Sequence, residues 1–182
     1  MTEEPIGGGH DRWFDAHLIK QLKMLQPKSI FDVGVGKGYN GKLIREALGN
    51  DIWLEGIEIF PDYITEETKE IYNNIVFGDV RTGGGDVWFD YQADVIIFGD
   101  VLEHMTHEEA MQVMYYIKGH FKWIIVNTPL GFLEHPEADG NEWEAHRCGL
   151  YPHDFDNFEV LDLNVRQKGI YAGLFNILLK GD

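Results

Sequence analysis

The sequence predicts an α/β fold in which a mostly parallel sheet ends in an antiparallel hairpin. Apolar runs of strand length alternate along the chain with segments whose apolar residues recur at helical spacing. Parallel strands need long crossover connections, usually helices, so this alternation predicts repeated strand-helix units. The last two apolar runs flank a turn that contains Gly169 and are expected to pair as a hairpin. We expect the 182 residues to form a single domain, residues 1–182, with a substantial core.

The first half of the chain contains three expected strands and three expected helices. Pro27 ends the first helical pattern, because proline does not continue a helix, and Gly49 is a suitable C-terminal cap for the second. Pro61 closes the second strand. In chain order, the elements are helix 12–25, strand 29–34, a helix that ends at Gly49, strand 52–59, helix 62–74 and strand 75–79.

Four further strands are expected in the second half. Thr106 and Glu109 have the spacing of a capping box, so a helix is expected to start at Thr106. A long insertion, residues 128–157, separates the fifth strand from the hairpin, and a final helix is expected after it. The strands are residues 94–98, 122–127, 159–165 and 174–179.

Charge and composition narrow the class of protein. Asp and Glu number 31 against 15 Lys and Arg, and the formal net charge of −16 repels phosphate backbones, so nucleic acid is a disfavoured partner. No apolar run approaches the roughly 20 residues of a membrane span, and residues 1–9 lack the apolar centre of a signal peptide. We therefore expect a cytoplasmic protein that does not contact a membrane. The single cysteine, Cys148, excludes an internal disulfide. The sequence does not fix the oligomeric state.

The most informative segment is residues 30–38, with the sequence IFDVGVGKG. An apolar strand that carries Asp32 runs directly into Gly34, Gly36 and Gly38. A strand that turns sharply and lets its backbone approach a ligand closely needs positions without side chains. An acid beside such a loop suits a ligand with positive charge.

A dinucleotide-binding fingerprint is a second interpretation of this loop. Gly36, Gly38 and Gly41 match the spacing G-x-G-x-x-G, and Glu58 follows at about the 20 residues expected of a ribose-binding acid. Two observations oppose a nicotinamide-dependent oxidoreductase. The strand is expected to end at Gly34, which makes Gly36 too late for the first turn glycine. In addition, a pyrophosphate gains nothing from the negative charge of Asp32.

The glycine loop and the acids after the second and third strands resemble the class I (Rossmann-like) S-adenosylmethionine (SAM)-dependent methyltransferases over nearly the whole chain. The resemblance implies a seven-stranded, doubly wound sheet with helices on both faces. It also implies that Glu58 accepts hydrogen bonds from the ribose hydroxyls and Asp79 from the adenine amino group. The implied cofactor-binding residues are Asp32, Gly34, Gly36, Gly38, Glu58, Ile59, Asp79, Val80 and Gly99.

Residues 98–105, FGDVLEHM, resemble the family's fourth motif, which borders the methionine part of SAM and the acceptor. Asp100, Glu103 and His104 converge in this turn. The order acid-x-x-acid-His is similar to the metal-holding turn of 2′-O-methyltransferases that act on small-RNA 3′ ends and of some quinone O-methyltransferases. In that reading, a divalent cation lowers the pKa of an acceptor hydroxyl. In the alternative reading, both acids orient the loop and His104 is structural.

A further ligand would come from the insertion, residues 128–157, where this family builds its substrate cap. His146 precedes Phe155 by nine residues, similar to the spacing after the additional metal histidine of the small-RNA enzymes. Asp100 replaces a glutamate of that pattern, and its tryptophan and second histidine are missing, so a divalent metal is left unassigned. Without a metal, we expect Asp100, His104 and His146 to be catalytic, with the imidazoles as general bases.

These observations predict methyl transfer from SAM to an oxygen or nitrogen nucleophile of a small-molecule acceptor, with S-adenosylhomocysteine (SAH) as product. The alternatives are a catalytically inert SAM-binding partner subunit and a metal-assisted 2′-O-methyltransferase that acts on RNA. Side chains of the N-terminal cap helix (residues 1–28), of one loop and of the insertion are expected to wall the acceptor pocket. They are Trp13, Phe14, His17, Trp88, Phe89, Tyr91, Phe132, Trp143 and Tyr151.

Overall fold

The computed structural model describes residues 12–82, 93–137, 140–168 and 172–181. Their seven strands form one sheet in the order β3-β2-β1-β4-β5-β7-β6. Neighbouring strands from β3 to β5 are parallel, and β6 and β7 form the predicted antiparallel hairpin. β7 also pairs antiparallel with β5. The strands are β1 (Ser29–Val33), β2 (Trp53–Glu58), β3 (Asn74–Phe77), β4 (Val95–Gly99), β5 (Trp123–Pro129), β6 (Glu159–Lys168) and β7 (Ala172–Lys180).

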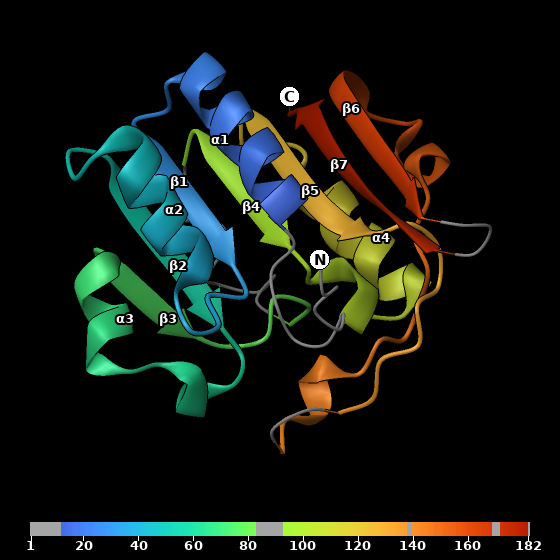
Figure 1. The fold of residues 1–182 in the computed structure, drawn as a ribbon, viewed down its shortest axis with the longest axis horizontal. Coiled ribbons are helices and arrows are strands. Elements are labelled where there is room, and N and C mark those ends of the chain that lie inside the picture. The colour runs from blue at the N-terminus through green and yellow to red at the C-terminus, as the bar shows by residue number, and fades with distance from the viewer. Residues whose placement is uncertain (1–11, 83–92, 138–139, 169–171, 182) are drawn as a thin grey trace, which may run out of the picture.

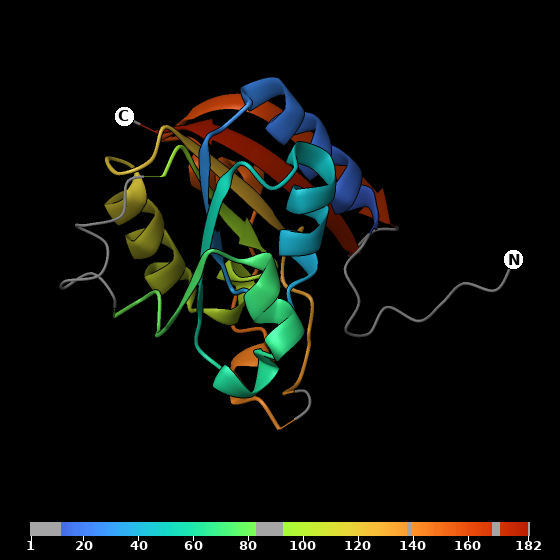
Figure 2. The same cartoon turned by 90° about the vertical axis from the view of Figure 1, so that its left-hand side faces the viewer.

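Helices cover both faces of the sheet, which confirms the doubly wound arrangement (Figures 1 and 2). α1 (Arg12–Leu25), α2 (Tyr39–Leu48) and α3 (Glu66–Ile71) lie on one face. α4 (His107–Ile117) lies on the other. The strand order reverses between β1 and β4, so the loops that follow these two strands diverge and leave room for a ligand.

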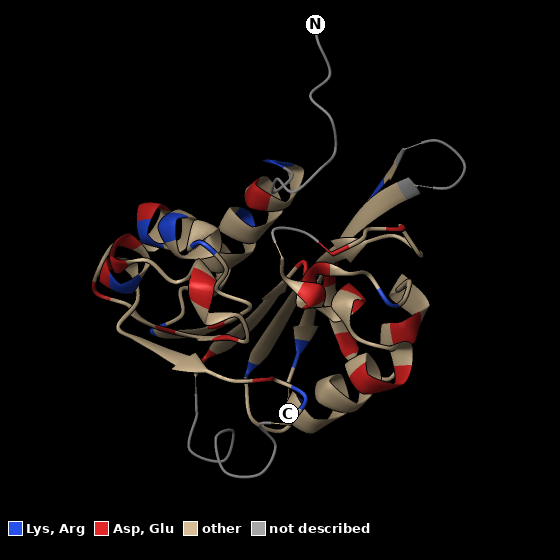
Figure 3. Ribbon diagram, turned by 90° about the horizontal axis from the view of Figure 1, so that it is seen from below, with Lys and Arg blue, Asp and Glu red and all other residues tan. Residues whose placement is uncertain are grey.

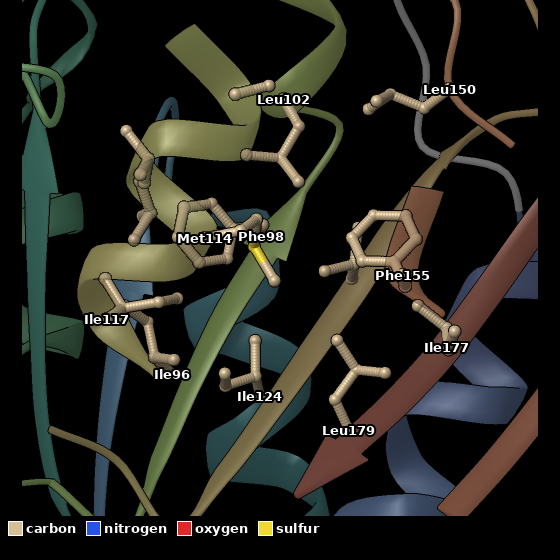
Figure 4. Packing of buried hydrophobic residues seen from close by; sticks show 14 of the residues in the cluster. Ile96, Phe98, Leu102, Met114, Ile117, Ile124, Leu150, Phe155, Ile177 and Leu179 are labelled. Atoms are coloured by element: carbon tan, nitrogen blue, oxygen red, sulfur yellow. The ribbon is translucent and has the colours of Figure 1, made fainter. Parts of the chain in front are cut away.

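Each face of the sheet has its own apolar core. On the first face, Leu18 and Leu22 of α1 and Ile44 of α2 pack against the sheet. On the second, Met114 and Ile117 of α4 do so. Figure 4 shows how this second core continues from α4 to the hairpin. Its labelled residues are Ile96, Phe98, Leu102, Met114, Ile117, Ile124, Leu150, Phe155, Ile177 and Leu179.

Two predicted helices differ from the structure. Instead of one helix over residues 62–74, a 3-10 turn (Pro61–Tyr63) precedes α3, because Thr65 forms a new capping box with Thr68. The final helix expected after the insertion is absent from the described residues, which form only 3-10 turns between β5 and β6, Glu142–Glu144 and Pro152–Phe155. Irregular contacts satisfy the backbone there. For example, the amides of Arg147 and Cys148 both donate to the Glu103 carbonyl.

Acidic residues are spread over helices and loops on both sides of the sheet, with Lys and Arg scattered among them (Figure 3). The negative charge of the chain is thus distributed over the described surface. None of the described helices has the length and hydropathy needed to cross a membrane. The glycines at 83–85 and the aromatic residues Trp88, Phe89 and Tyr91 lie outside the described residues.

Candidate active site

A cleft opens at the carboxyl ends of β1, β2, β3 and β4, beside the reversal of strand order. Open α/β sheets bind ligands at this position. Loops that follow the strands form its floor and walls, and the Glu142–Glu144 turn of the insertion adds Trp143 and Glu144. The predicted site residues that line it are Gly34, Gly36, Glu58, Ile59, Asp79, Val80, Asp100 and His104.

The glycine loop needs two of its glycines for different reasons. Gly34 has a φ of +74°, and a Cβ there would lie 2.6 Å from Cγ2 of Val101, so a side chain would displace the loop after β4. Gly36 has a φ of +54°, and its amide donates a 2.7 Å hydrogen bond to Glu58. Gly38 instead caps α2 and faces α3, because a Cβ there would lie 3.1 Å from Ile71.

Glu58 ends β2 and is fixed by the backbone around it. Its Oε2 accepts from the Gly36 amide and its Oε1 accepts from the Phe60 amide at 2.8 Å. Burial raises the pKa of Glu58, and these backbone hydrogen bonds oppose the rise. The carboxylate therefore lines the cleft with both oxygens oriented and with lone pairs left over for a ligand.

Asp32 does not line the cleft, contrary to the direct role expected beside a cationic cofactor. Its fully buried carboxylate accepts a 2.6 Å hydrogen bond from the Tyr72 hydroxyl and a 3.3 Å hydrogen bond from Asn40. Burial raises the pKa of Asp32 to about 7. Successive residues of a strand point to opposite faces of the sheet. Phe31 and Val33 point to the α4 face, so the Asp32 side chain points to the face covered by α2 and α3. Gly99 likewise faces Asn40.

Asp79 follows β3 and lines the cleft together with Arg81, a residue that the sequence interpretation did not include. Arg81 donates to both Asp79 oxygens at 2.7–3.0 Å, and its guanidinium lies 4.9 Å from the Trp143 ring. Burial acts to raise the pKa of Asp79, but the hydrogen bonds from Arg81 outweigh it and lower the pKa. The only sequence signal for Arg81 is its place two residues after a strand-end acid.

The turn after β4 brings Asp100 and His104 to the opposite wall of the cleft, while Glu103 of the same turn is buried and does not line it. Asp100 has a φ of +55°, which is rare outside glycine, and its amide donates to the Asn127 carbonyl at 2.9 Å. The Glu103 side chain is buried, with Oε2 accepting from the Thr128 hydroxyl at 3.1 Å. Its Oε1 has no hydrogen-bond partner among the described residues. Burial, reinforced by the charge of Asp100, raises the pKa of Glu103 well above its ordinary value.

His146 does not line the cleft, but its ligand atoms approach those of Glu103 and His104. One potential ligand atom from each of the three residues lies within 4.8 Å of the others. The Nδ1 of His146 lies 2.7 Å from the Leu133 carbonyl, and the Nδ1 of His104 lies 3.4 Å from that of Ala145. Backbone carbonyls orient metal-binding imidazoles in this way. Asp100 is not part of this group.

The three side chains have the donor set of a divalent-cation site, one carboxylate and two imidazoles. Burial lowers the pKa of His146 to about 4 and lowers that of His104, so both imidazoles are neutral near pH 7. The neutral form of imidazole is the one that ligates a metal, and a pKa of about 4 makes His146 a weak base, which differs from its expected role as a general base. The unpartnered Glu103 Oε1 also fits a cation as its missing partner.

Of the predicted acceptor-pocket side chains that the structure describes, only Trp143 lines the cleft. Trp13, Phe14 and His17 lie on α1, where Phe14 is buried and Trp13 contacts Arg166 of β6. Phe132 and Tyr151 are exposed on the insertion. The insertion crosses to the loop after β2, where the Tyr63 hydroxyl donates to Glu144 at 3.0 Å.

No protein-family model matches the chain, and no curated protein matches it in sequence. Solved structures do match it. The N-terminal domain of EvdMO1 with SAH bound has a TM-score of 0.70 at 13% identity, over 92% of this chain and 81% of that one. Magnesium protoporphyrin IX methyltransferase (ChlM) from Synechocystis PCC 6803, also with SAH bound, has a TM-score of 0.63 at 17% identity, over 96% and 90%.

The small RNA methyltransferase HEN1 has a TM-score of 0.63 at 15% identity, with 100% of this chain matched to 27% of that one. At these identities the likeness concerns the fold. The strand order, the antiparallel last strand and the position of the cleft agree with it. The chain therefore has the fold of the class I SAM-dependent methyltransferases.

Proposed function

We propose that this protein is a SAM-dependent methyltransferase that acts on an oxygen or nitrogen nucleophile of a small-molecule acceptor. The observation that supports this most directly is that one cleft is lined by the glycine loop, by an acid at the end of β2 and by an acid after β3. These groups match the needs of a methionine tail, a ribose and an adenine in that order along the sheet. The fold shared with SAH-bound proteins agrees with it.

In this proposal, the glycine loop and Glu58 bind the methionine and ribose parts, and Asp79 binds the adenine amino group. Ile59 and Val80, which line the cleft beside them, pack on the adenine faces. Asp32, Gly38 and Gly99 act from behind the cleft: they hold the loop and the strand ends against α2 and α3. The adenosine position is thus set by backbone geometry at successive strand ends.

When bound, SAM would supply the methyl group of its sulfonium to the acceptor nucleophile. The sulfur keeps the electron pair of the broken carbon–sulfur bond, and the acceptor loses a proton. Asp100 and His104 line the wall where the acceptor would lie. His104 and Asp100 hold the nucleophile in line with the methyl group, and positioning of this kind supplies much of the rate of a methyl transfer. Either side chain is placed to take the acceptor proton through a hydrogen bond or one water.

Metal-assisted transfer to a hydroxyl is the second candidate, favoured by the convergence of Glu103, His104 and His146 and by the unpartnered Glu103 oxygen. These three residues would hold a divalent cation, which would lower the pKa of an acceptor hydroxyl. The net charge of −16 disfavours an RNA acceptor, so a small hydroxylated molecule is the better match.

The test of the proposed function is calorimetric titration of the purified protein with SAM, with SAH and with reduced nicotinamide dinucleotide. We expect SAM and SAH to bind and the dinucleotide not to bind. Binding of the dinucleotide alone would contradict the proposal and favour an oxidoreductase. Release of SAH during incubation of SAM with hydroxylated and amine acceptors then separates an enzyme from an inert binding subunit.

A further inference from the structure

Arg81 connects three parts of the site that belong to different segments of the chain. It forms a bidentate ion pair with Asp79, the acid after β3. It also forms a 3.2 Å ion pair with Glu109, in the first turn of α4, and its guanidinium packs over the ring of Trp143, from the insertion. Only 17% of the Arg81 side chain is exposed, so these contacts are shielded from solvent more than ordinary surface pairs are.

The contact with Glu109 reaches the start of α4, the helix that follows the turn with Asp100 and His104. Glu109 belongs to the capping box of α4: its Oε2 accepts from the amide and the hydroxyl of Thr106, each at 2.8 Å, while Oε1 accepts from Arg81. Thr106 follows the turn that carries Asp100 and His104. One guanidinium therefore fixes the acid on the adenine side relative to the start of the helix that follows the acceptor turn.

The contact with Trp143 reaches the insertion. Arg147 packs on the same ring, with 5.8 Å between its guanidinium and the ring centroid, so the indole contacts two cations. A planar guanidinium can stack on an aromatic ring while its edge donates to a carboxylate, and lysine cannot do both. Arg81 is thus suited to hold Asp79 and Trp143 in one arrangement.

We propose that Arg81 is a positioning residue that orients Asp79 toward the adenine amino group of SAM and couples this contact to the placement of Trp143 over the cleft. The inference rests on the proposed function, in which Asp79 binds adenine. Arg81 itself donates but does not accept, so it cannot recognise the amino group; it acts by fixing the carboxylate that does. Loss of Arg81 should therefore weaken recognition of the amino group in particular.

The test compares SAH with its 6-oxo analogue, S-inosylhomocysteine, which lacks the amino group. In calorimetry, the wild-type protein should bind SAH more tightly than the 6-oxo analogue. In Arg81→Ala we expect SAH affinity to fall on the order of tenfold, as for loss of a charged hydrogen-bonding partner, and the preference over the 6-oxo analogue to shrink. Arg81→Lys should restore part of the preference, because it keeps the charge without the bidentate geometry.

A double-mutant cycle tests the coupling to the insertion. Trp143→Leu should lower SAH affinity in the wild-type background and should have a smaller effect in Arg81→Ala, because the link to Asp79 is already lost. Lys122→Ala is the matched control: it removes the Lys122–Asp94 ion pair at the opposite end of β4 and should leave the affinity for both ligands unchanged.

The outcomes separate this inference from the proposed function. Absence of SAH binding to the wild-type protein contradicts the proposed function itself. If the wild type binds SAH and Arg81→Ala lowers the affinity for both ligands by the same factor, or for neither, Arg81 is only a structural residue and the inference is wrong. Additive effects of the Arg81 and Trp143 substitutions overturn the coupling.

Discussion

The two halves of the cleft are built in different ways. The half that the proposed function assigns to adenosine (the adenosine half) consists of Gly34, Gly36, Glu58 and Asp79, which lie at or just after the ends of parallel strands. The half that the proposed function assigns to the acceptor (the acceptor half) has Asp100 and His104 in the cleft lining, and Glu103 and His146 approach His104 from outside the lining. It joins a turn after β4 to the insertion. In the first half the sheet aligns the strand ends, and Arg81 ties Asp79 to Glu109 and Trp143. The second half depends on backbone carbonyls of the insertion to orient its imidazoles.

This difference indicates that cofactor binding and acceptor chemistry can be disrupted separately. Substitutions in the adenosine half should change SAH affinity, and substitutions in the acceptor half should change metal binding or turnover with SAH affinity preserved. Apart from the contacts of Arg81, which join Asp79 to α4 and to Trp143, we expect the two halves to behave additively, which makes the separation measurable.

The largest effect is expected for Glu58→Gln. The substitution removes the charge that would bind two ribose hydroxyls and weakens the hydrogen bond from the Gly36 amide. We expect SAH affinity to fall by about a hundredfold in calorimetry, from the loss of two hydrogen bonds to a charged group. The control is Glu55→Gln on the same strand, where the acid contacts Asn74 and does not line the cleft. Equal affinity of Glu58→Gln and wild type would remove Glu58 from the site.

An intermediate effect is expected for His146→Ala, confined to the acceptor half. If Glu103, His104 and His146 hold a divalent cation, the variant should lose most of its Mn²⁺ affinity, since one of three protein ligands is gone. SAH affinity should stay within about twofold, because His146 does not line the cleft. His153→Ala, which changes an exposed histidine, is the control. Mn²⁺ binding that is equal in all three proteins would contradict the metal-assisted candidate.

The smallest effect on SAH affinity is expected for Asp32→Asn. This substitution should instead change how stability depends on pH. Burial raises the pKa of Asp32 from 3.8 to about 7, with Glu58 adding to the rise and Tyr72 and Asn40 opposing it. At a pH between 3.8 and about 7, Asp32 is protonated in the folded protein and ionised in the unfolded chain. The free energy of unfolding should therefore fall as pH rises from about 4 to about 7, by at most about 1.4 kcal/mol per pH unit. The asparagine variant should lack this slope.

Urea unfolding at pH 5 and pH 7 measures the difference. Asp94→Asn is the control. The pKa of Asp94 is lowered, because hydrogen bonds from Lys122, Lys28 and Ser29 outweigh burial, so Asp94 stays ionised over this range and its loss should not change the slope. An unchanged slope in Asp32→Asn would show that Asp32 is ionised in the folded protein at pH 5.

The adenosine half could be predicted from the sequence to a large extent because it follows from strand order. Gly34, Glu58 and Asp79 lie at or just after strand ends, and parallel pairing brings such ends to one edge. The sequence also predicts the strand that carries Asp32, but it predicts a direct contact of Asp32 with the cofactor, whereas the side chain is fully buried. Neighbouring residues of a strand point to opposite faces of the sheet. The contacts of Asp32 with Tyr72 and Asn40 show that its side chain points away from the cleft, and the sequence does not report these contacts.

The acceptor half was predictable only in part. The grouping of Glu103, His104 and His146 could be anticipated by resemblance, whereas the exclusion of Asp100 from that group and the lowered pKa of His146 depend on burial and on loop geometry. Arg81 and Trp143 meet across 62 positions of sequence, and no local pattern reports such a contact. In place of the helix expected after the insertion, the described residues form a 3-10 turn, Pro152–Phe155, followed by the local hydrogen bond from the Phe158 amide to the Phe155 carbonyl.

A crystal structure of the protein with SAH would test the assignment of both halves at once. We expect the ribose hydroxyls within hydrogen-bond distance of Glu58, the adenine amino group on the Asp79 carboxylate and the sulfur facing the turn that carries Asp100 and His104. SAH bound elsewhere, or in this cleft with the adenine on the acceptor half, would contradict the assignment of both halves.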